Sequence, residues 1–198
     1  MALKFQYNKT IIQQFRKQLS IREKALPILK NKETALRTEA KEALKRLAEL
    51  KKEREAIGKK LEAFSKFWFE FPHVLVLQDE GIYTKKVVGV NLPEVGEVEF
   101  EVEDISWKEY PSWVPAGVDI LKQVITCDIK IDTIAKQAHL LDLARKKTTQ
   151  KVNLYEKVQI PAYEDAILKI KRFLEDKENI SKAAQKIVKK KKERRAAA

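Results

Sequence analysis

The 198-residue chain carries 41 Lys and Arg against 29 Asp and Glu, and 35% of its residues are charged. It has no run of about 18 consecutive apolar residues, so we expect no membrane-spanning helix, and its polar first residues lack the apolar core of a signal peptide. Cys127 is the single cysteine, which excludes an internal disulfide and a cysteine metal cluster and favours a reducing, intracellular compartment.

Charge divides the chain into three parts, which are our predicted domains. Residues 1–70 hold 18 basic and 9 acidic residues and form an N-terminal coiled-coil helix. Residues 71–117 hold 3 basic and 9 acidic residues, together with four of the five glycines and four of the six prolines, and form an acidic insert. Residues 118–198 hold 20 basic and 11 acidic residues and form a C-terminal coiled-coil helix with a basic tail.

The first part is predicted to be one long helix over about residues 10–67, with Asn8 or Thr10 as its N-cap. Apolar residues recur every seven positions in two series that are offset by three residues, which is the pattern of a coiled-coil seam. The seam positions that we single out in this helix are Leu29, Leu36, Leu47, Leu50, Ile57 and Phe64.

The central part contains three strand-like segments, "HVLVL", "IYTKKVVGV" and "EVEFEVE". The first two are separated by "QDEG", which has the composition of a turn. Trp107 and Trp113 also lie here, and they indicate either the small core of the insert or an exposed docking surface.

The third part repeats the coiled-coil pattern, and a further series spaced by three and four residues follows from Ile160 to Leu174. Two long seams separated by a compact insert predict an antiparallel helix pair. We expect facing residue numbers to add to about 188, so that Leu47 faces Leu141 and two prolines, Pro27 and Pro161, lie level and bend the pair. A register one heptad away fits nearly as well. The seam positions in this part are Val124, Ile131, Ile134, Leu141, Val152 and Tyr155.

A search for catalytic or metal-binding patterns yields none. The two histidines, His73 and His139, are far apart in the sequence and lack the spacing of metal ligands. Cys127 falls on a seam position, where core packing explains it better than nucleophilic chemistry. We therefore predict a protein without catalytic residues, cofactor or metal.

Two motifs carry a family resemblance. "KVNLYEKVQIP", from Lys151 to Pro161, resembles the "RVNALE-V-IP" motif of the D subunit of vacuolar and archaeal-type rotary ATPases. "ILKNKETAL", from Ile28 to Leu36, is similar to that family's "LLKDKRDEL", and Asn8 and Thr10 fall on its "NPT" start. Lys9 in place of proline and "NLYE" in place of "NALE" point to a bacterial branch.

The resemblance implies the central rotor axle of a V/A-type ATPase or ATP synthase, without catalytic residues of its own. Implied partners are the catalytic A and B subunits, the F subunit of the stalk and the C/d-type subunit that docks on the membrane ring. The implied place is the cytoplasmic, inner face of the cell membrane, peripherally bound and without membrane insertion. The resemblance also implies a β-hairpin, for which "HVLVLQDEGIYTKKVVGV" is our candidate. We expect both chain ends to contact the catalytic hexamer through Lys4, Lys9, Arg16, Lys17, Lys169, Lys171 and Arg172.

Two other functions compete with this reading. A prefoldin-like chaperone also pairs helices around β-hairpins, but it is normally shorter and lacks these motifs. A basic coiled coil that binds nucleic acid would show salt-dependent association. The basic ends of the chain favour that alternative only weakly, because the acidic insert and the absence of a recognition module oppose it, and we expect no nucleic-acid partner.

Overall fold

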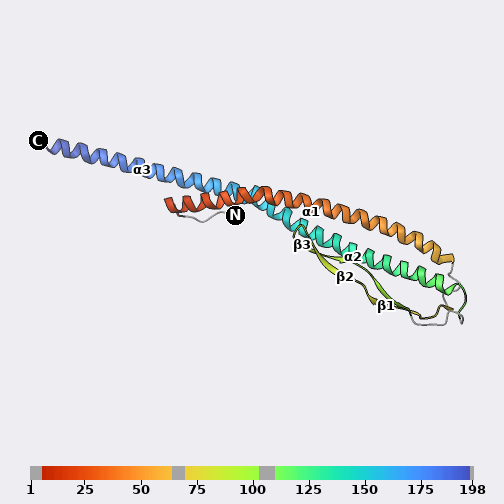
Figure 1. Ribbon diagram of the computed structural model, residues 1–198. Helices are drawn as coiled ribbons and strands as arrows, with labels where there is room; N and C mark the ends of the chain where they lie inside the picture. The colour runs from red at the N-terminus through yellow and green to blue at the C-terminus, as the bar shows by residue number, and fades with distance from the viewer. Residues whose placement is uncertain (1–5, 64–69, 103–109, 197–198) are drawn as a thin grey trace. The chain divides into compact units, whose positions relative to one another are not determined.

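The computed structural model describes residues 6–63, 70–102 and 110–196. Helix α1 spans Lys9–Ala63, α2 spans Val114–Asn153 and α3 spans Ile160–Ala196, and the π-helix η2 (Leu154–Gln159) joins α2 to α3 (Figure 1). Between α1 and α2, the described residues form four strands, namely β1 (Leu75–Asp79), β2 (Ile82–Val87), β3 (Val90–Val95) and β4 (Glu99–Val102). The predicted fold class, long N- and C-terminal helices around a small β-containing insert, is confirmed.

Internal contacts divide the chain into two compact units. We call Met1–Asn31 with Thr148–Ala198 the terminal unit and Lys32–Lys147 the insert unit. Each unit contains a segment of α1 and a segment of the helices that follow the insert. Each is described separately below.

In the insert unit, α1 packs antiparallel against α2. Near the middle of the unit, Leu36 and Ala43 of α1 share a buried cluster with Ala138 and Leu141 of α2. Further along, Ile57 clusters with α2 residues of lower number, as an antiparallel pairing requires. The members of this second buried cluster are Ile57, Val124 and Cys127.

The predicted register of this pairing is wrong by one heptad. The direct contacts of Arg54 with Asp128 and of Cys127 with Leu50 add to 182 and 177, below the expected sum of about 188. Apolar periodicity alone cannot distinguish two registers that differ by seven residues, because both keep every seam position apolar. Charge pairing can, and Arg54 Nε lies 2.7 Å from Asp128 Oδ1 in the observed register.

In the terminal unit, the start of α1 packs antiparallel against α3. Ile12 forms a buried cluster with Ile167 and Ile170, whose side chain is fully buried. Asn8 caps the first turn, because its Oδ1 accepts a hydrogen bond of 2.7 Å from the backbone N–H of Ile11. Of the two predicted N-caps, Asn8 is therefore the correct one.

The strands form two antiparallel ladders, β1 with β4 and β2 with β3. A β-hairpin is present, as predicted, but the predicted segment is wrong. β1 does not pair with β2, and the stretch read as one strand, "IYTKKVVGV", contains β2, a turn and the first residue of β3.

The missed turn lies at Val88 and Gly89. Both have positive φ, 50° and 78°, as the mirror-image turns of two-residue hairpins require. Valine rarely adopts this conformation because its branched side chain crowds the backbone. The turn therefore lacks the Asn-Gly or Asp-Gly signature by which such turns are found in a sequence.

The "QDEG" stretch instead carries the chain from one ladder to the other. The backbone N–H of Gly81 donates to Asp79 Oδ1 at 3.1 Å, and the N–H of Gly96 donates to the carbonyl oxygen of Gly81 at 2.9 Å. Gly81 has a φ of 61°, so glycine suits this crossing point.

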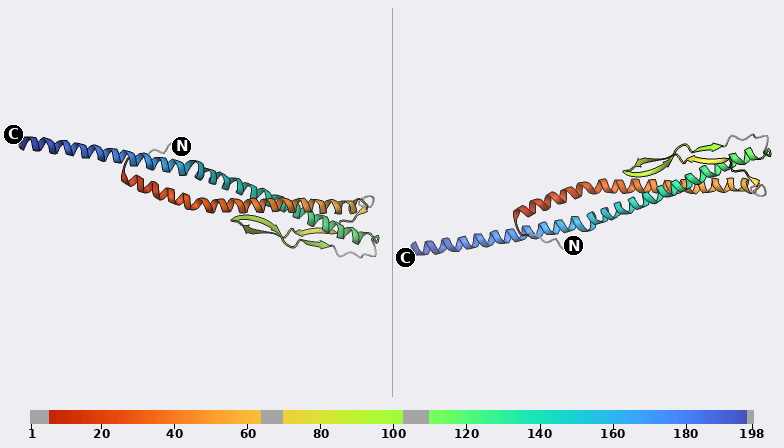
Figure 2. Two further views of the ribbon diagram at one scale, coloured as in Figure 1. Left: turned by 90° about the horizontal axis from the view of Figure 1, so that it is seen from above. Right: turned by 90° about the horizontal axis from the view of Figure 1, so that it is seen from below.

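The β2–β3 hairpin packs on the helix pair of the insert unit, and Figure 2 shows it lying along these helices in two further views. Leu92 of β3, 5% exposed, belongs to the same buried cluster as Leu36 and Leu141. The side-chain amide of Gln137 in α2 donates a hydrogen bond to the carbonyl oxygen of Pro93. The insert is thereby fixed to both helices.

One of the two central tryptophans lies among the described residues. Trp113 is half-buried at the start of α2, and its ring centroid lies 6.0 Å from that of Phe71. This contact places Trp113 in a small aromatic cluster beside the insert. Trp107 and the seam residue Phe64 lie outside the described residues.

Candidate interaction site

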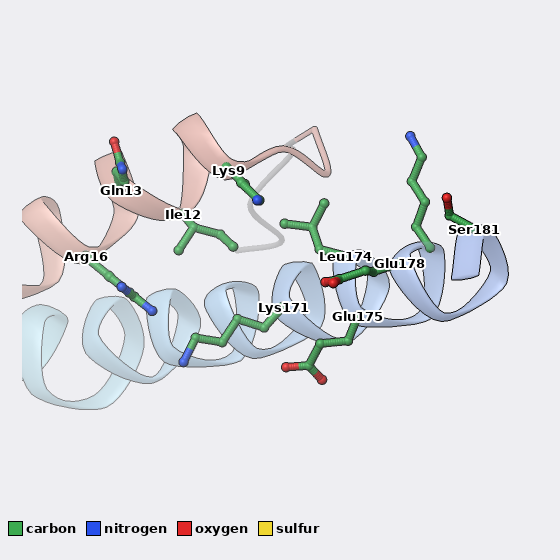
Figure 3. Close-up of a pocket in the computed structure, with 10 residues that line it drawn as sticks. Lys9, Ile12, Gln13, Arg16, Lys171, Leu174, Glu175, Glu178 and Ser181 are labelled. Atoms are coloured by element: carbon green, nitrogen blue, oxygen red, sulfur yellow. The ribbon is translucent and has the colours of Figure 1, made fainter. Parts of the chain in front are cut away.

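The terminal unit contains an open groove of about 590 Å³ between the first turns of α1 and the middle of α3. Figure 3 shows Ile12 and Leu174 pointing into the space between the two helices, with charged side chains around them. Such a groove presents a narrow apolar floor with a polar, mostly basic rim. Its lining residues are Lys9, Ile12, Gln13, Arg16, Lys171, Leu174, Glu175, Lys177, Glu178 and Ser181.

One acidic residue of the rim is held in its charged form. Glu178 Oε1 lies 2.8 Å from Lys182 Nζ. The hydrogen bond from Lys182, followed by its charge and the charge of Lys9 across the groove, lowers the pKa of Glu178 below its usual value. Negative charge at Glu178 therefore persists at neutral pH and offsets part of the basic rim.

The structure brings together three of the seven residues that we expected to contact a catalytic hexamer. Lys9 and Arg16 from α1 and Lys171 from α3 line the groove. Three others are exposed on the same helices but do not line it, namely Lys17, Lys169 and Arg172. Lys4 lies outside the described residues.

The predicted seam positions lie on the inner faces of the helices. Four of them are buried: Leu36, Ile57, Val124 and Leu141. The others in the described ranges are half-buried: Leu29, Leu47, Leu50, Ile131, Ile134, Val152 and Tyr155.

Beyond the groove, α3 continues as a basic helix with apolar residues on its surface. Ile180, Ile187 and Val188 are exposed, and Ile180 is 70% exposed. Residues 177–195 carry nine Lys and Arg against two Glu. This segment offers a partner both apolar contacts and positive charge.

The centre of the "KVNLYEKVQIP" motif folds as η2. Here the backbone N–H of Ile160 donates to the carbonyl oxygen of Tyr155, five residues earlier, as in a π-helix. Pro161 follows directly, and since proline has no N–H and its ring would crowd the carbonyl four residues before it, a widened turn at this place is favourable.

Pro161 does not lie level with Pro27, contrary to our prediction. Arg22 of α1 contacts Gln159, and Lys30 contacts Glu156, so Pro27, between them, lies level with η2. The error follows directly from the one-heptad error in register. Pro27 itself lies inside the continuous helix α1.

Arg22 of α1 has defined partners beside η2. Its Nε donates to Gln159 Oε1 at 2.6 Å, and its Nη1 donates to Gln18. The guanidinium carbon lies 4.6 Å from the ring centroid of Tyr163 and 5.9 Å from that of Tyr155. These distances are within the range of cation–π attraction. The two tyrosines flanking "IP" were the signal that could have located this site.

Within the described ranges, no group of three or more His, Cys, Asp or Glu side chains is placed to hold a metal ion. His73 and His139 are exposed, and Cys127 is buried in the helix pair of the insert unit. Burial raises the pKa of the Cys127 thiol, which keeps it protonated and unreactive. The described helices include none long and apolar enough to cross a membrane.

The fold is that of an antiparallel two-helix coiled-coil protein with a small β-containing insert. Comparison with known sequences shows the family to which the chain belongs. A sequence model of the family described as the ATP synthase D subunit matches residues 12–190. The chain belongs to this family, and it is accordingly a component of a rotary ATPase complex, as the two motifs indicated.

Relatives in bacteria agree. The V-type ATP synthase D subunit of Borreliella burgdorferi is 33% identical over 143 residues, which cover 71% of this chain and 69% of that protein. The protein of the same name from Chlamydia muridarum is 27% identical over 173 residues, which cover 84% of this chain and 85% of that protein. That from Chlamydia pneumoniae is 26% identical over 179 residues, or 87% and 85% of the two chains.

Proposed function

We propose that this chain is the central rotor axle of a V/A-type ATPase or ATP synthase. It transmits rotation between the catalytic A/B hexamer and the ion-translocating membrane ring, and it has no catalytic role of its own. The observation that carries this proposal, beside family membership, is the terminal unit. There the two ends of the chain pair through Ile12, Ile167 and Ile170 and present one basic groove.

The physical properties of such a pair suit an axle. Helices whose apolar faces are buried against each other resist twisting better than a single helix does. The rim cations Lys9, Arg16 and Lys171 are exposed, and exposed ion pairs are worth only about 0.2–1 kcal/mol each. Contacts of that strength to acidic patches of a surrounding collar form and break at each step without locking the rotor.

The remaining partners follow from the same proposal. The F subunit of the stalk and the C/d-type subunit on the membrane ring bind the part of the chain that the hexamer leaves uncovered. The complex holds the chain peripherally at the inner face of the cell membrane.

The experiment that tests the axle role is size-exclusion chromatography of this chain with the A and B subunits, after nuclease treatment and at moderate salt. We expect one copy of the chain to co-elute with each hexamer.

Failure to associate, even when the F subunit is present, would contradict the proposal. Co-elution with nucleic acid after a high-salt wash would instead support the nucleic-acid alternative.

A second experiment tests the groove. The triple variant Lys9→Glu, Arg16→Glu, Lys171→Glu reverses the charge of the basic rim. We expect the ATPase activity that the A/B hexamer gains from this chain to fall several-fold. The matched control reverses three exposed lysines of α1 in the insert unit, Lys41, Lys51 and Lys52. Equal activity of the two variants would show that the groove has no special part in coupling.

A further inference from the structure

The seam changes phase by one residue at η2. Seam residues alternate in steps of three and four up to Val152 and Tyr155, so the same spacing would place 159 and 162, and then 166 and 169, on the seam. In the structure Ala166 is buried, but Lys169 is exposed, and the residues that cluster with Ile12 are Ile167 and the fully buried Ile170. The seam of α3 therefore lies one residue later than the seam of α2 predicts.

The π-helix accounts for this step. One residue of an ordinary α-helix turns the chain by about 100°, so an extra residue would rotate the apolar face of α3 away from α1. A π-helical turn contains one residue more than an α-helical turn and absorbs such an insertion. Helix α1 needs no such adjustment, since its heptads run through this level without a shift.

Arg22 contacts the insertion along its whole length. Tyr155 lies at the second residue of η2, Gln159 is its last residue, and Tyr163 lies one turn beyond it. One guanidinium contacts all three, by a hydrogen bond to Gln159 and over the two tyrosine rings. Because these contacts need the extra residue between Tyr155 and Tyr163, they favour its present place over any other.

We propose that η2 is a one-residue insertion that can move along the helix, and that Arg22 is the clamp that holds it here. When Arg22 loses these contacts, the insertion moves into a neighbouring turn of the helix. The residues between its old and its new place then turn a different face to α1. The proposal concerns the chain alone and stands or falls independently of the axle function.

A deletion tests whether η2 is an inserted residue. Removing the exposed residue Lys157 joins the two seams in one continuous heptad pattern. Pro161→Ala is added, because η2 no longer accommodates the proline. We expect this variant to melt within about 4 °C of Pro161→Ala alone, since the core contacts persist. The matched control deletes the exposed Lys136 from α2. This deletion shifts the seam of α2 with no extra residue to compensate for it, and it should lower the melting temperature by more than about 10 °C. Equal losses would overturn the proposal.

Disulfide cross-linking tests the clamp, in a Cys127→Ser background. With Arg22 present, cysteines at positions 12 and 170 should cross-link, and cysteines at 12 and 169 should not, because a disulfide forms only between suitably close Cβ atoms. In Arg22→Met, an insertion that has moved beyond position 170 brings position 169 to face Ile12. If the insertion moves in the other direction, Asn153 takes the place of Val152 opposite Leu29. A pair of cysteines at positions 29 and 153 detects this movement.

We expect Arg22→Met to raise the yield of one of these shifted cross-links, 12 to 169 or 29 to 153, by about tenfold, because hydrogen bonds to charged groups contribute roughly that factor or more. Arg16→Met, which removes an arginine of α1 that has no contact with η2 among those described, is the control and should leave both yields unchanged. Cross-links in Arg22→Met that match those of the control would overturn the role of Arg22.

Discussion

Replacing three glycines by alanine, one at a time, separates the observed hairpin from the predicted one. Gly58 lies in α1, and an added Cβ would be 3.6 Å from Arg54 Nη1, an ordinary contact. Alanine in a helix is about 0.5–1 kcal/mol more favourable than glycine, so Gly58→Ala should stabilise the protein by about that amount.

Gly89→Ala, in contrast, should destabilise the protein. Its φ of 78° costs an alanine about 1–2 kcal/mol. The nearest atom to the new Cβ, Lys32 Nζ at 3.3 Å, is the tip of a flexible side chain and can move away. Gly81→Ala should be worse than Gly89→Ala, because its φ is 61° and its Cβ would lie 2.1 Å from the carbonyl oxygen of Glu97.

Two assays read out this series. Urea unfolding followed by circular dichroism measures the gain for Gly58→Ala. Amide hydrogen exchange in β2 and β3 measures hairpin opening, which we expect to be about 5–30 times more frequent in Gly89→Ala. Unchanged exchange in Gly89→Ala would refute the turn at Val88 and Gly89, and a destabilised Gly58→Ala would refute the Cβ geometry on which the comparison rests.

Three further predictions concern packing, pH and salt. Ile170→Ala should cost about 2–5 kcal/mol in urea unfolding because the side chain is fully buried, whereas Leu168→Ala, at an exposed position of the same helix, should cost well under half as much. The folded-state pKa of Cys127 lies above its ordinary value of about 9 because the thiol is buried. The contribution of the protonated thiol to folding stability is therefore fully present below pH 9 and is lost as the pH rises toward the folded pKa. Thermal melts at pH 7.5 and 9.5 should therefore show a larger loss for the parent than for Cys127→Ala, and equal losses would contradict this. Asp128→Asn should cost about 0.2–1 kcal/mol through the half-exposed pair with Arg54, which also raises the pKa of that arginine. That cost should shrink at high salt, as comparison of melts at 0.05 and 1 M salt would show.

Much of the helical architecture could be predicted from the sequence because coiled-coil seams repeat over many residues. Leu36, Ile57 and Leu141 belong to long periodic series, so an error at one position does not change the helix assignment. The register was harder, because a shift of seven residues leaves that periodicity intact. It depends on single pairs such as Arg54 and Asp128, which are exposed in part and carry no periodic signal.

The insert was predicted less well for a local reason. Its true hairpin turn uses Val88, a residue that disfavours positive φ, and the glycine after it was read as part of a strand. Conversely, Asp79 and Gly81 do make a turn-like contact, but it leads between ladders. Local composition located places where the chain changes direction without showing which strands become neighbours.

For the groove and for η2, the sequence likewise indicates which residues matter but not how they come together. The basic residues at both ends were predicted as a contact surface, and the structure groups Lys9, Arg16 and Lys171 around one groove. The extra residue was present in the sequence as the second apolar series beginning at Ile160, but its meaning needed the partner helix. Arg22 could not be assigned a role until both tyrosines were seen beside it.

The antiparallel pairing has a consequence for how the chain is made. Ile57 meets Val124, 67 residues later, whereas Ile12 must wait for Ile170, 158 residues later. At about 5–20 residues per second, the apolar face at the start of α1 stays without its partner for roughly 8–32 s during synthesis. The insert unit can close first and shorten the remaining loop, so the terminal unit, whose paired segments lie farther apart in the sequence, forms after it.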